Sequence, residues 1–347
     1  MHVDDVTEIR DRASGAGIAL VGESPAFRGL LRSIDRVARH GAATVLIRGE
    51  TGTGKELIAR SIHYLGARRD APFVPINCGA LPDQLAENEF FGHRAGAFTG
   101  AGGESLGLLK LAHRGTLFLD EVDSLPSKTQ VALLRFLQDG SFRPLGAGRE
   151  ERVDVRIIAA SNRDLEGEVQ AGRFRPDLFF RLNLIAVCVP PLRERAEDVR
   201  LLTHYFLREC AKRYRLDDKH LDDRSLIRLC RYAWPGNVRE LENLVHRAYL
   251  LAEGAQLDIS LPGEPAMPRI MSMMPASDVG GENDLDYRSA KLRALQQFDR
   301  DYLTRLLQRA AGNVTKAAQL AGKERRALGK LLKRYGIERH GDPVARD

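Results

Sequence analysis

The 347-residue chain lacks the features that mark membrane and secreted proteins. No stretch approaches the roughly 18 uninterrupted apolar residues that a membrane-spanning helix needs. Its first twenty residues lack the basic start and apolar centre of a secretory signal, and instead carry Asp4, Asp5, Glu8 and Asp11. Four cysteines stand without Cys-x-x-Cys spacing, which excludes the common zinc and redox motifs. We therefore expect a cytoplasmic protein with reduced thiols and no membrane partner.

Charge is distributed unevenly along the chain. The formal net charge is +6, but residues 288–340 alone hold fourteen Lys and Arg against four Asp and Glu. That segment therefore carries +10 and leaves −4 for the other residues. A solvated basic helix face would explain part of this imbalance. A basic module joined to a slightly acidic body also indicates that a polyanion binds at one end only.

The region 18–190 alternates short β-branched runs with segments of helical period. Each run is nearly continuously apolar, as in strands buried on both faces of a parallel sheet. The candidate strands are 44–48, 73–77, 116–120, 155–160 and 184–189. Helical spacing at 55–65 and 128–138 completes the pattern, so we predict an α/β fold with a parallel sheet flanked by helices.

The remaining segments differ in composition. Residues 191–258 show helical patterns only, interrupted at Trp234-Pro235-Gly236, and are predicted to form an all-helical subdomain. Residues 259–287 contain four prolines and a Gly-Gly pair, which indicates a linker. The basic segment 288–340 is helical again, and the polar residues 1–17 are interpreted as a short N-terminal tail.

The clearest chemical motif follows directly on the first candidate strand and opens a helix. It consists of Gly49-Glu50-Thr51-Gly52-Thr53-Gly54-Lys55. In such a P-loop, glycines let backbone N–H groups surround the phosphates, and the lysine neutralises the β/γ oxygens. Position 56 is Glu, where most P-loops place Ser or Thr to hold Mg²⁺. Either the metal relies on other ligands, or Glu56 reaches it directly or through water.

An acidic pair ends the strand at 116–120. Asp120-Glu121 follows Leu117-Phe118-Leu119 and lies 65 residues after the P-loop lysine. In a P-loop protein this pattern puts Asp120 beside the metal and Glu121 where it can polarise the attacking water. We therefore predict a hydrolase that uses ATP with Mg²⁺, not merely a nucleotide-binding protein.

A glycine-flanked segment lies between these two motifs. Phe90-Phe91-Gly92-His93 is followed by Gly96-Ala97-Phe98-Thr99-Gly100-Ala101. Flanking glycines ease reshaping of the backbone, so an aromatic-tipped loop that touches a partner is expected. Together with the nucleotide motifs, this segment resembles the AAA+ domain of bacterial enhancer-binding proteins, the activators of sigma-54 RNA polymerase. The resemblance implies that the hexapeptide contacts the sigma factor, chiefly through Phe98 and Thr99.

The same resemblance implies roles for five further polar residues. Asn77 would restrain the catalytic glutamate until a partner is engaged, because an amide can hold a carboxylate in a non-productive rotamer. Asn162 would sense the γ-phosphate, and Arg239 would sense the nucleotide from the helical lid. Arg175 and Arg181 would reach the nucleotide of the neighbouring subunit, a contribution worth ~10³–10⁵ in rate for known arginine fingers. Such sharing implies a homo-oligomeric ring, hexameric by resemblance.

Two positions beside the loop depart from the family pattern. Arg94 stands where many relatives carry an acid, and Phe90 replaces a common Leu. We expect both to tune the loop without removing its contact with the sigma factor.

The basic segment contains helical patterns at 302–310, from 313 onward, and at 324–335, separated by Gly312-Asn313 and Gly322. Two helices joined by a tight turn, with a basic second member, are typical of a helix-turn-helix. This segment resembles the Fis-type DNA-binding domain of the same activators. The residues predicted to contact DNA, mostly at phosphates, are Arg325, Arg326, Lys330, Lys333 and Arg334. A mid-helix Gly329 departs from the pattern and leaves open a dimerisation bundle that no longer reads DNA.

The motifs together predict a sigma-54-dependent transcriptional activator. It would bind upstream DNA through 288–340 and use ATP hydrolysis by its AAA+ domain, 18–258, to convert the closed promoter complex into the open one. Two alternatives are a DNA-bound repressor with residual ATPase activity and a general AAA+ remodelling ATPase. About 17 residues precede the ATPase region, too few for a receiver or ligand-sensing domain, so we expect control in trans through an inhibitory partner, a co-activator or abundance.

Overall fold

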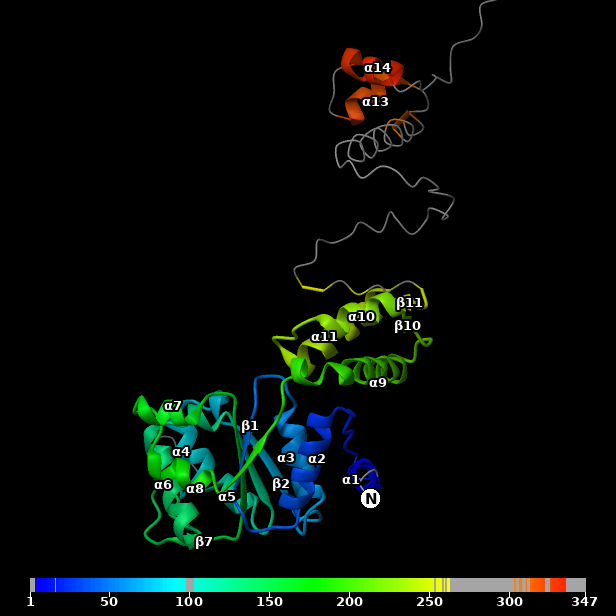
Figure 1. Cartoon of the computed structure of the whole chain (residues 1–347). Coiled ribbons are helices and arrows are strands. Elements are labelled where there is room, and N and C mark those ends of the chain that lie inside the picture. Colours follow the sequence, from blue (N-terminus) through cyan, green and yellow to red (C-terminus); the bar gives the residue numbers. More distant parts are fainter. Residues whose placement is uncertain are drawn as a thin grey trace, which may run out of the picture. The chain divides into compact units, whose positions relative to one another are not determined.

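The structure, a computed structural model, describes most of the chain. The described residues are 4–15, 17–97, 103–252, 254–257, 259, 261–262, 303, 306–307, 310, 313–321 and 325–334. They fall into two compact units, Met1–Pro265 and Ala266–Asp347, each described here by itself (Figure 1).

A five-stranded parallel sheet forms the centre of the first unit. Its strand order is β2-β5-β8-β1-β9. The strands are β1 (Val45–Arg48), β2 (Phe73–Asn77), β5 (Thr116–Asp120), β8 (Arg156–Ser161) and β9 (Ile185–Cys188). All five predicted strands are confirmed, with ends shifted by at most one residue. Parallel pairing places the carboxyl ends of these strands along one edge, where ligands bind in open α/β sheets.

Helices cover both faces of the sheet because successive strand residues point to opposite sides. Val45 and Ile47 pack in one apolar cluster with α2 (Pro25–Ala38) and α3 (Lys55–Tyr64). Leu46 packs in a second cluster on the opposite face. The helices around that face are α4 (Asp83–Phe91), α5 (Leu108–Leu111), α6 (Ser127–Asp139), α7 (Leu165–Gln170) and α8 (Pro176–Leu182). The predicted helices at 55–65 and 128–138 are confirmed as α3 and α6.

Two short antiparallel hairpins project from this α/β part. In the first, β3 (Gly92–His93) pairs with β4 (Ser105–Leu106). In the second, β6 (Ser141–Phe142) pairs with β7 (Glu151–Arg152). Three single 3-10 turns complete the connections: η1 (Cys78–Ala80), η2 (Val122–Ser124) and η3 (Leu192–Arg195).

The N-terminal segment differs from the polar tail that the sequence predicts. Residues Asp4–Gly15 form helix α1, and its Ile9 and Ala13 are buried in the same cluster as α2. These two residues are four positions apart and therefore share one helix face. Arg12 adds a hydrogen bond of 3.1 Å to the carbonyl oxygen of Leu65. The few apolar residues of the segment are thus enough to attach it to the sheet domain.

A helical lid follows the sheet. It comprises α9 (Ala196–Tyr214), α10 (Asp223–Arg231) and α11 (Asn237–Leu251) around a fully buried Trp234. The predicted break at 234–236 is confirmed, since α10 ends before it and α11 begins after it. The prediction of helices only is wrong in one detail: β10 (His220–Leu221) pairs with β11 (Gln256–Leu257). Two-residue strands carry no periodicity that a sequence reading could detect.

The second unit contains α13 (Val314–Leu320) and α14 (Arg325–Arg334). Asn313 caps α13 by accepting hydrogen bonds from the N–H groups of Thr315 and Lys316. Leu328 and Leu332 of α14 are buried with Leu303, Leu306, Leu307, Ala310, Ala317 and Ala318. Most of the predicted helix at 302–310 and of the linker at 259–287 lies outside the described residues. Within the described ranges, no helix combines the length and apolarity that crossing a bilayer would require.

Candidate active site

A cavity of about 480 Å³ lies where the P-loop, the acidic pair and the lid meet. Its walls come from segments that follow β1, β5 and β8, so it sits at the carboxyl edge of the sheet. This volume suits a nucleotide-sized ligand. The predicted nucleotide residues that line it are Thr51, Gly52, Thr53, Gly54, Lys55, Glu56, Asp120, Glu121, Asn162 and Arg239.

The P-loop backbone has the conformation that its glycines permit. Gly52 and Gly54 have φ angles of 79° and 94°, in the left-handed region that other residues avoid. Gly54 precedes the first turn of α3, whose free N–H groups form an anion site. The Nζ of Lys55 donates to the carbonyl oxygens of Gly49 at 2.8 Å and Glu50 at 3.1 Å. Burial lowers the pKa of the Lys55 ammonium, and the charges of the nearby acids oppose that shift.

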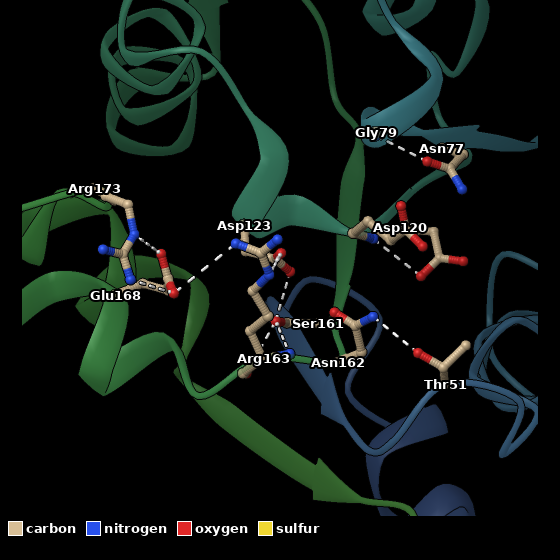
Figure 2. Close-up of polar contacts among 11 residues, drawn as sticks. Thr51, Asn77, Gly79, Asp120, Asp123, Ser161, Asn162, Arg163, Glu168 and Arg173 are labelled. Carbon is tan, nitrogen blue, oxygen red and sulfur yellow. Dashed lines mark hydrogen bonds and ion pairs between the residues drawn. The ribbon is translucent and has the colours of Figure 1, made fainter. Parts of the chain in front are cut away.

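Asp120 and Glu121 both line the cavity although they are consecutive in the chain. Residues of an extended strand point alternately to opposite faces, but Glu121 leaves the strand with a left-handed φ of 52°. Its N–H donates to Asp120 Oδ1 at 3.0 Å, the contact drawn beside Asp120 in Figure 2. Burial raises the pKa of Asp120, while the ammonium of Lys55 opposes this by favouring the carboxylate. The turn thus presents two carboxylates with different surroundings to the same ligand space.

Asn77 lies beside the acidic pair but is engaged elsewhere. It pairs with Asp120 in the β2–β5 register. Its Oδ1 accepts hydrogen bonds from the N–H groups of Gly79 at 2.8 Å and Ala80 at 3.2 Å, which caps η1 (Figure 2). Among the described residues, no hydrogen bond joins the Asn77 amide to Glu121. Restraint of the glutamate by Asn77 therefore stays a prediction.

Asn162 links the end of β8 to the P-loop. Its Nδ2 donates to Thr51 Oγ1 at 2.9 Å, and it lines the cavity (Figure 2). The preceding residue, Ser161, donates from Oγ to Asp123 Oδ1 at 2.7 Å, just beyond the acidic pair. The strand end that carries Asn162 thus contacts the P-loop and the η2 turn that follows the acidic pair, and the sensor role of Asn162 stays a prediction.

The oxygen donors at the site suit Mg²⁺ that arrives with ATP. The described residues contain no cluster of three or more potential protein ligands. Mg²⁺ commonly uses only one or two carboxylates and takes its other ligands from phosphates and water. Asp120, the predicted magnesium ligand, is partly buried in the charge field of Lys55 and lines the cavity. The carboxylate of Glu56 instead accepts from Arg60 Nε at 3.0 Å and Nη2 at 2.8 Å on its own helix.

The lid closes the cavity from the other side and touches the P-loop directly. The N–H of Arg239 donates to the carbonyl oxygen of Gly52 at 3.2 Å. A Cβ at Gly52 would collide with the carbonyl oxygen of Gly236, so only glycine allows this approach. Glu50, predicted to bind nucleotide, does not line the cavity and instead forms an ion pair with Arg193 of η3. Arg193 lowers the pKa of Glu50 to about 2, with help from a hydrogen bond donated by Asn237.

The two predicted arginine fingers face away from this chain's own cavity. Neither Arg175 nor Arg181 is among its lining residues. Arg175 pairs with the Asp177 carboxylate through Nε at 3.0 Å and Nη2 at 2.7 Å. Arg181 Nε donates to the carbonyl oxygen of Leu137 at 3.3 Å. Both are exposed, Arg175 directly before α8 and Arg181 within it, and their role at the nucleotide of another subunit stays a prediction.

The sequence did not predict one end of the cavity, where the base of the nucleotide would lie. That end is lined mainly by small and apolar residues: Gly17, Ala19, Leu20, Val21, Phe27, Leu202, Tyr205, Phe206 and Val238. The sequence also did not predict a cation at this end, where the Arg195 guanidinium lies 5.1 Å from the centre of the Phe27 ring. None of these positions forms a short motif, because they come from three separate segments that meet only in the fold.

The predicted sigma-contact loop lies between β3 and β4. Gly96 and Ala97 are described, whereas Phe98, Thr99, Gly100 and Ala101 lie outside the described residues. At the base of the loop, Arg94 forms ion pairs with Glu104 at 2.6 Å and with Glu151 of β7 at 2.8 Å. Lys110 joins Glu151 at 3.0 Å. A cluster of alternating charge therefore connects the two hairpins.

The predicted DNA-contacting residues lie on α14. Arg325, at its start, is exposed, and the apolar face of the helix is turned inward through Leu328 and Leu332. For Arg326, Lys330, Lys333 and Arg334, the backbone is helical and the side chains lie outside the description. Five basic residues on one ten-residue helix suit a phosphate-rich partner.

Three family models match the chain in succession. The model described as a sigma-54 interaction domain matches residues 20–188. An AAA+ ATPase lid domain matches 193–264, and a bacterial regulatory protein of the Fis family matches 294–335.

Relatives resemble nearly the whole chain. The response regulator protein PilR of Pseudomonas aeruginosa is 44% identical over 325 residues, which cover 92% of this chain and 70% of PilR. The transcriptional regulatory protein GlrR of Escherichia coli is 41% identical, covering 92% and 68% respectively. The DNA-binding transcriptional regulator NtrC of Azospirillum brasilense is 40% identical, covering 92% and 70%.

Solved structures show the same architecture. NtrX of Brucella abortus in complex with ATP is 34% identical, with a TM-score of 0.64 over 96% of this chain and 72% of NtrX. Its complex with ADP gives a TM-score of 0.65 with the same identity and coverage.

Proposed function

The chain belongs to the sigma-54-dependent transcriptional activators, AAA+ ATPases with a Fis-type DNA-binding domain, and from this membership we propose that it remodels the sigma-54 RNA polymerase closed complex with energy from ATP. It binds upstream DNA through the basic segment 288–340 and acts on polymerase through the loop at 96–101. Activation of RNA polymerase on DNA requires that the protein be in the cytoplasm.

The single observation that carries the proposal is the cavity in which Lys55, Asp120 and Glu121 meet. Lys55 neutralises charge on the β- and γ-phosphates, and its hydrogen bonds to the P-loop carbonyls hold it at the loop. Glu121 orients the attacking water and accepts its proton as the bond to the γ-phosphorus forms and the bond to the β-γ bridging oxygen breaks. Asp120 would hold Mg²⁺, which supplies charge neutralisation at the phosphates.

A ring of identical subunits, hexameric as in the family, supplies what one chain lacks at this site. Arg175, directly before α8, and Arg181, on α8, are exposed and absent from their own cavity, which supports donation to a neighbour. Repeated head-to-tail contacts of this kind close into rings. Asn162 then senses the γ-phosphate, with its contact to Thr51 as the link to the P-loop, and Arg239 senses the nucleotide from the lid.

The hairpins carry this change toward the polymerase. The loop at 96–101 follows β3, whose backbone is tied to the second hairpin: Arg94 N–H donates to the Leu145 carbonyl at 3.0 Å, and Leu145 N–H to the Gly92 carbonyl at 2.9 Å. A shift at the acidic pair can reach these hairpins through packed elements with discrete arrangements.

Promoter opening with purified components tests the proposal. The protein should form open complexes only with the sigma-54 form of polymerase and only with hydrolysable ATP. Thr99→Ala should abolish opening while ATP hydrolysis stays within about twofold of the original rate, because the residue belongs to the predicted sigma-contact hexapeptide and to neither nucleotide motif. Opening with another sigma factor would contradict the proposal, as would a Thr99→Ala variant that still opens promoters.

A further inference from the structure

Glu50 stands in the P-loop but its side chain is turned away from the ligand. It does not line the cavity, although its neighbour Thr51 does. Instead, its carboxylate forms a two-pronged ion pair with Arg193, at 2.8 Å from Oε2 to Nη1 and 2.6 Å from Oε1 to Nη2. Arg193 belongs to η3, the turn through which the sheet domain passes into the lid.

Asn237 joins the same contact from the first residue of α11. It is fully buried and has a left-handed φ of 53°. Its Nδ2 donates to Glu50 Oε2 at 3.2 Å and to the Thr51 carbonyl oxygen at 3.0 Å. Its Oδ1 accepts from the N–H of Leu192 at 2.8 Å. One side chain therefore connects the P-loop, η3 and the lid helix.

Arg239 lies two residues farther along the same helix. Its backbone N–H donates to the Gly52 carbonyl oxygen at 3.2 Å, and its side chain lines the cavity. Burial is the main cause that lowers the pKa of Lys55, and the charge of Arg239 adds to the effect. The guanidinium therefore lies in electrostatic range of the lysine that binds phosphate.

We propose that Glu50 is a positioning residue that fixes the lid to the P-loop, so that Arg239 stands over the phosphates of ATP. It acts through Arg193 and Asn237 and does not touch the nucleotide. The inference rests on the ATPase part of the proposed function and is independent of sigma-54.

Stability alone does not account for this arrangement. The side chains of Arg193 and Glu50 are 46% and 42% exposed, and ion pairs at such positions contribute little to folding. What the pair does fix is geometry, because a bidentate guanidinium–carboxylate contact allows one relative orientation. That orientation is between the loop that binds phosphate and the helix that carries Arg239.

A double-mutant cycle on the full chain tests the inference. Glu50→Ala should lower kcat/KM for ATP by about tenfold in the original sequence, a typical scale for coupling between sites. In an Arg239→Ala background the same change should cost less than about twofold, since the residue through which Glu50 acts is gone. If Arg239→Ala removes hydrolysis altogether, the cycle is read in the Kd of a non-hydrolysable ATP analogue.

Two further variants separate positioning from damage to the P-loop. Glu209→Ala removes an acid from an exposed ion pair with Lys212 elsewhere on the lid, and should leave kcat/KM unchanged. The reversed pair, Glu50→Arg with Arg193→Glu, should recover most of the activity lost in either single variant. Melting curves identify variants that fail to fold, for which Glu50→Gln takes the place of Glu50→Ala.

Two results would overturn the inference. If Glu50→Ala lowers kcat/KM as much in the Arg239→Ala background as in the original sequence, Glu50 acts on the nucleotide without the lid. Unchanged kcat/KM in the folded Glu50→Ala protein would reduce the contact to an ordinary ion pair. Either result leaves sigma-54-dependent promoter opening, measured separately, as it stands.

Discussion

Arg94 and Glu151 form an ion pair of 2.8 Å although 57 residues separate them in the chain. The same guanidinium holds Glu104 at 2.6 Å on the far side of the sigma-contact loop. Arg94 is therefore the shared cationic partner of two acids, one in each hairpin region. The base of the loop is thereby joined to the second hairpin by charge as well as by backbone hydrogen bonds.

Arg94→Glu should uncouple the loop from hydrolysis. Three carboxylates would then face one another across the two hairpins, and like charges at this spacing repel. We expect open-complex formation to fall by about tenfold while ATPase activity changes less than twofold. Arg143→Glu is the matched control. Arg143 lies 3.8 Å from Glu150 in the second hairpin, and most of the Arg143 side chain is exposed. Equal losses in both variants would show that hairpin charge in general, and not Arg94, sets the loop.

Mixing two inactive variants should restore ATP hydrolysis. A Lys55→Ala subunit lacks its own phosphate contact but keeps Arg175 and Arg181 for its neighbour. An Arg181→Ala subunit keeps Lys55 in its own cavity but lacks Arg181 for its neighbour. In randomly mixed rings, roughly a quarter of the interfaces pair an intact cavity with an intact neighbouring arginine. We expect about that fraction of the original rate in a steady-state phosphate-release assay. If the mixture stays as inactive as its components, Arg181 serves its own chain.

Asp120→Asn should stabilise the nucleotide-free fold while removing hydrolysis. Burial raises the pKa of Asp120, so folding disfavours its charged form, and that cost is present at pH values above the raised pKa. The cost disappears as the pH falls below the ordinary pKa, where the group is protonated in both states. We expect Tm to rise by about 2–4 °C near pH 8, and the gain to shrink toward acid.

Asp70→Asn is the control for this measurement, because the Asp70 side chain is 92% exposed and should give no gain at any pH. A gain that grows on acidification would contradict the assigned cause.

Gly329→Ala should stabilise the C-terminal unit by about 1 kcal/mol, the helix-propensity difference between the two residues. A Cβ at position 329 meets no atom within 4 Å, so the methyl group fits without rearrangement. Gly29→Ala is the matched variant in α2, where the space is equally open, and should shift only the transition of the first unit. Calorimetry of the whole chain resolves the two transitions. A destabilised Gly329→Ala protein would show that α14 needs its glycine.

The sequence was most informative where short runs carry regular chemistry. Nearly continuous apolar runs such as Leu117-Phe118-Leu119 can be buried on both sheet faces, and the structure places each predicted strand in one parallel sheet. Lys55, Asp120, Glu121 and Asn162 meet in the cavity because each lies at or beyond the carboxyl end of a strand, and these ends reach the same edge of the sheet.

Contacts between distant segments could not be predicted from the sequence. Glu50 looks like a phosphate-loop residue, yet its partner Arg193 is 143 positions away and belongs to no motif. The sequence predicts a tail in place of helix α1 because two buried side chains, Ile9 and Ala13, are too few to stand out in a polar segment. Both errors arise from tertiary packing, which local composition does not encode.

The close approach at Gly52 limits which parts of this protein are interchangeable with those of other ATPases. A Cβ there would meet both the Gly236 carbonyl and the Cβ of Arg239. Any chimera that grafts a foreign lid onto this sheet must keep a backbone of the same shape opposite that glycine. The P-loop and the lid backbone opposite it are therefore shaped for each other, and a change in one limits the changes that the other can accept.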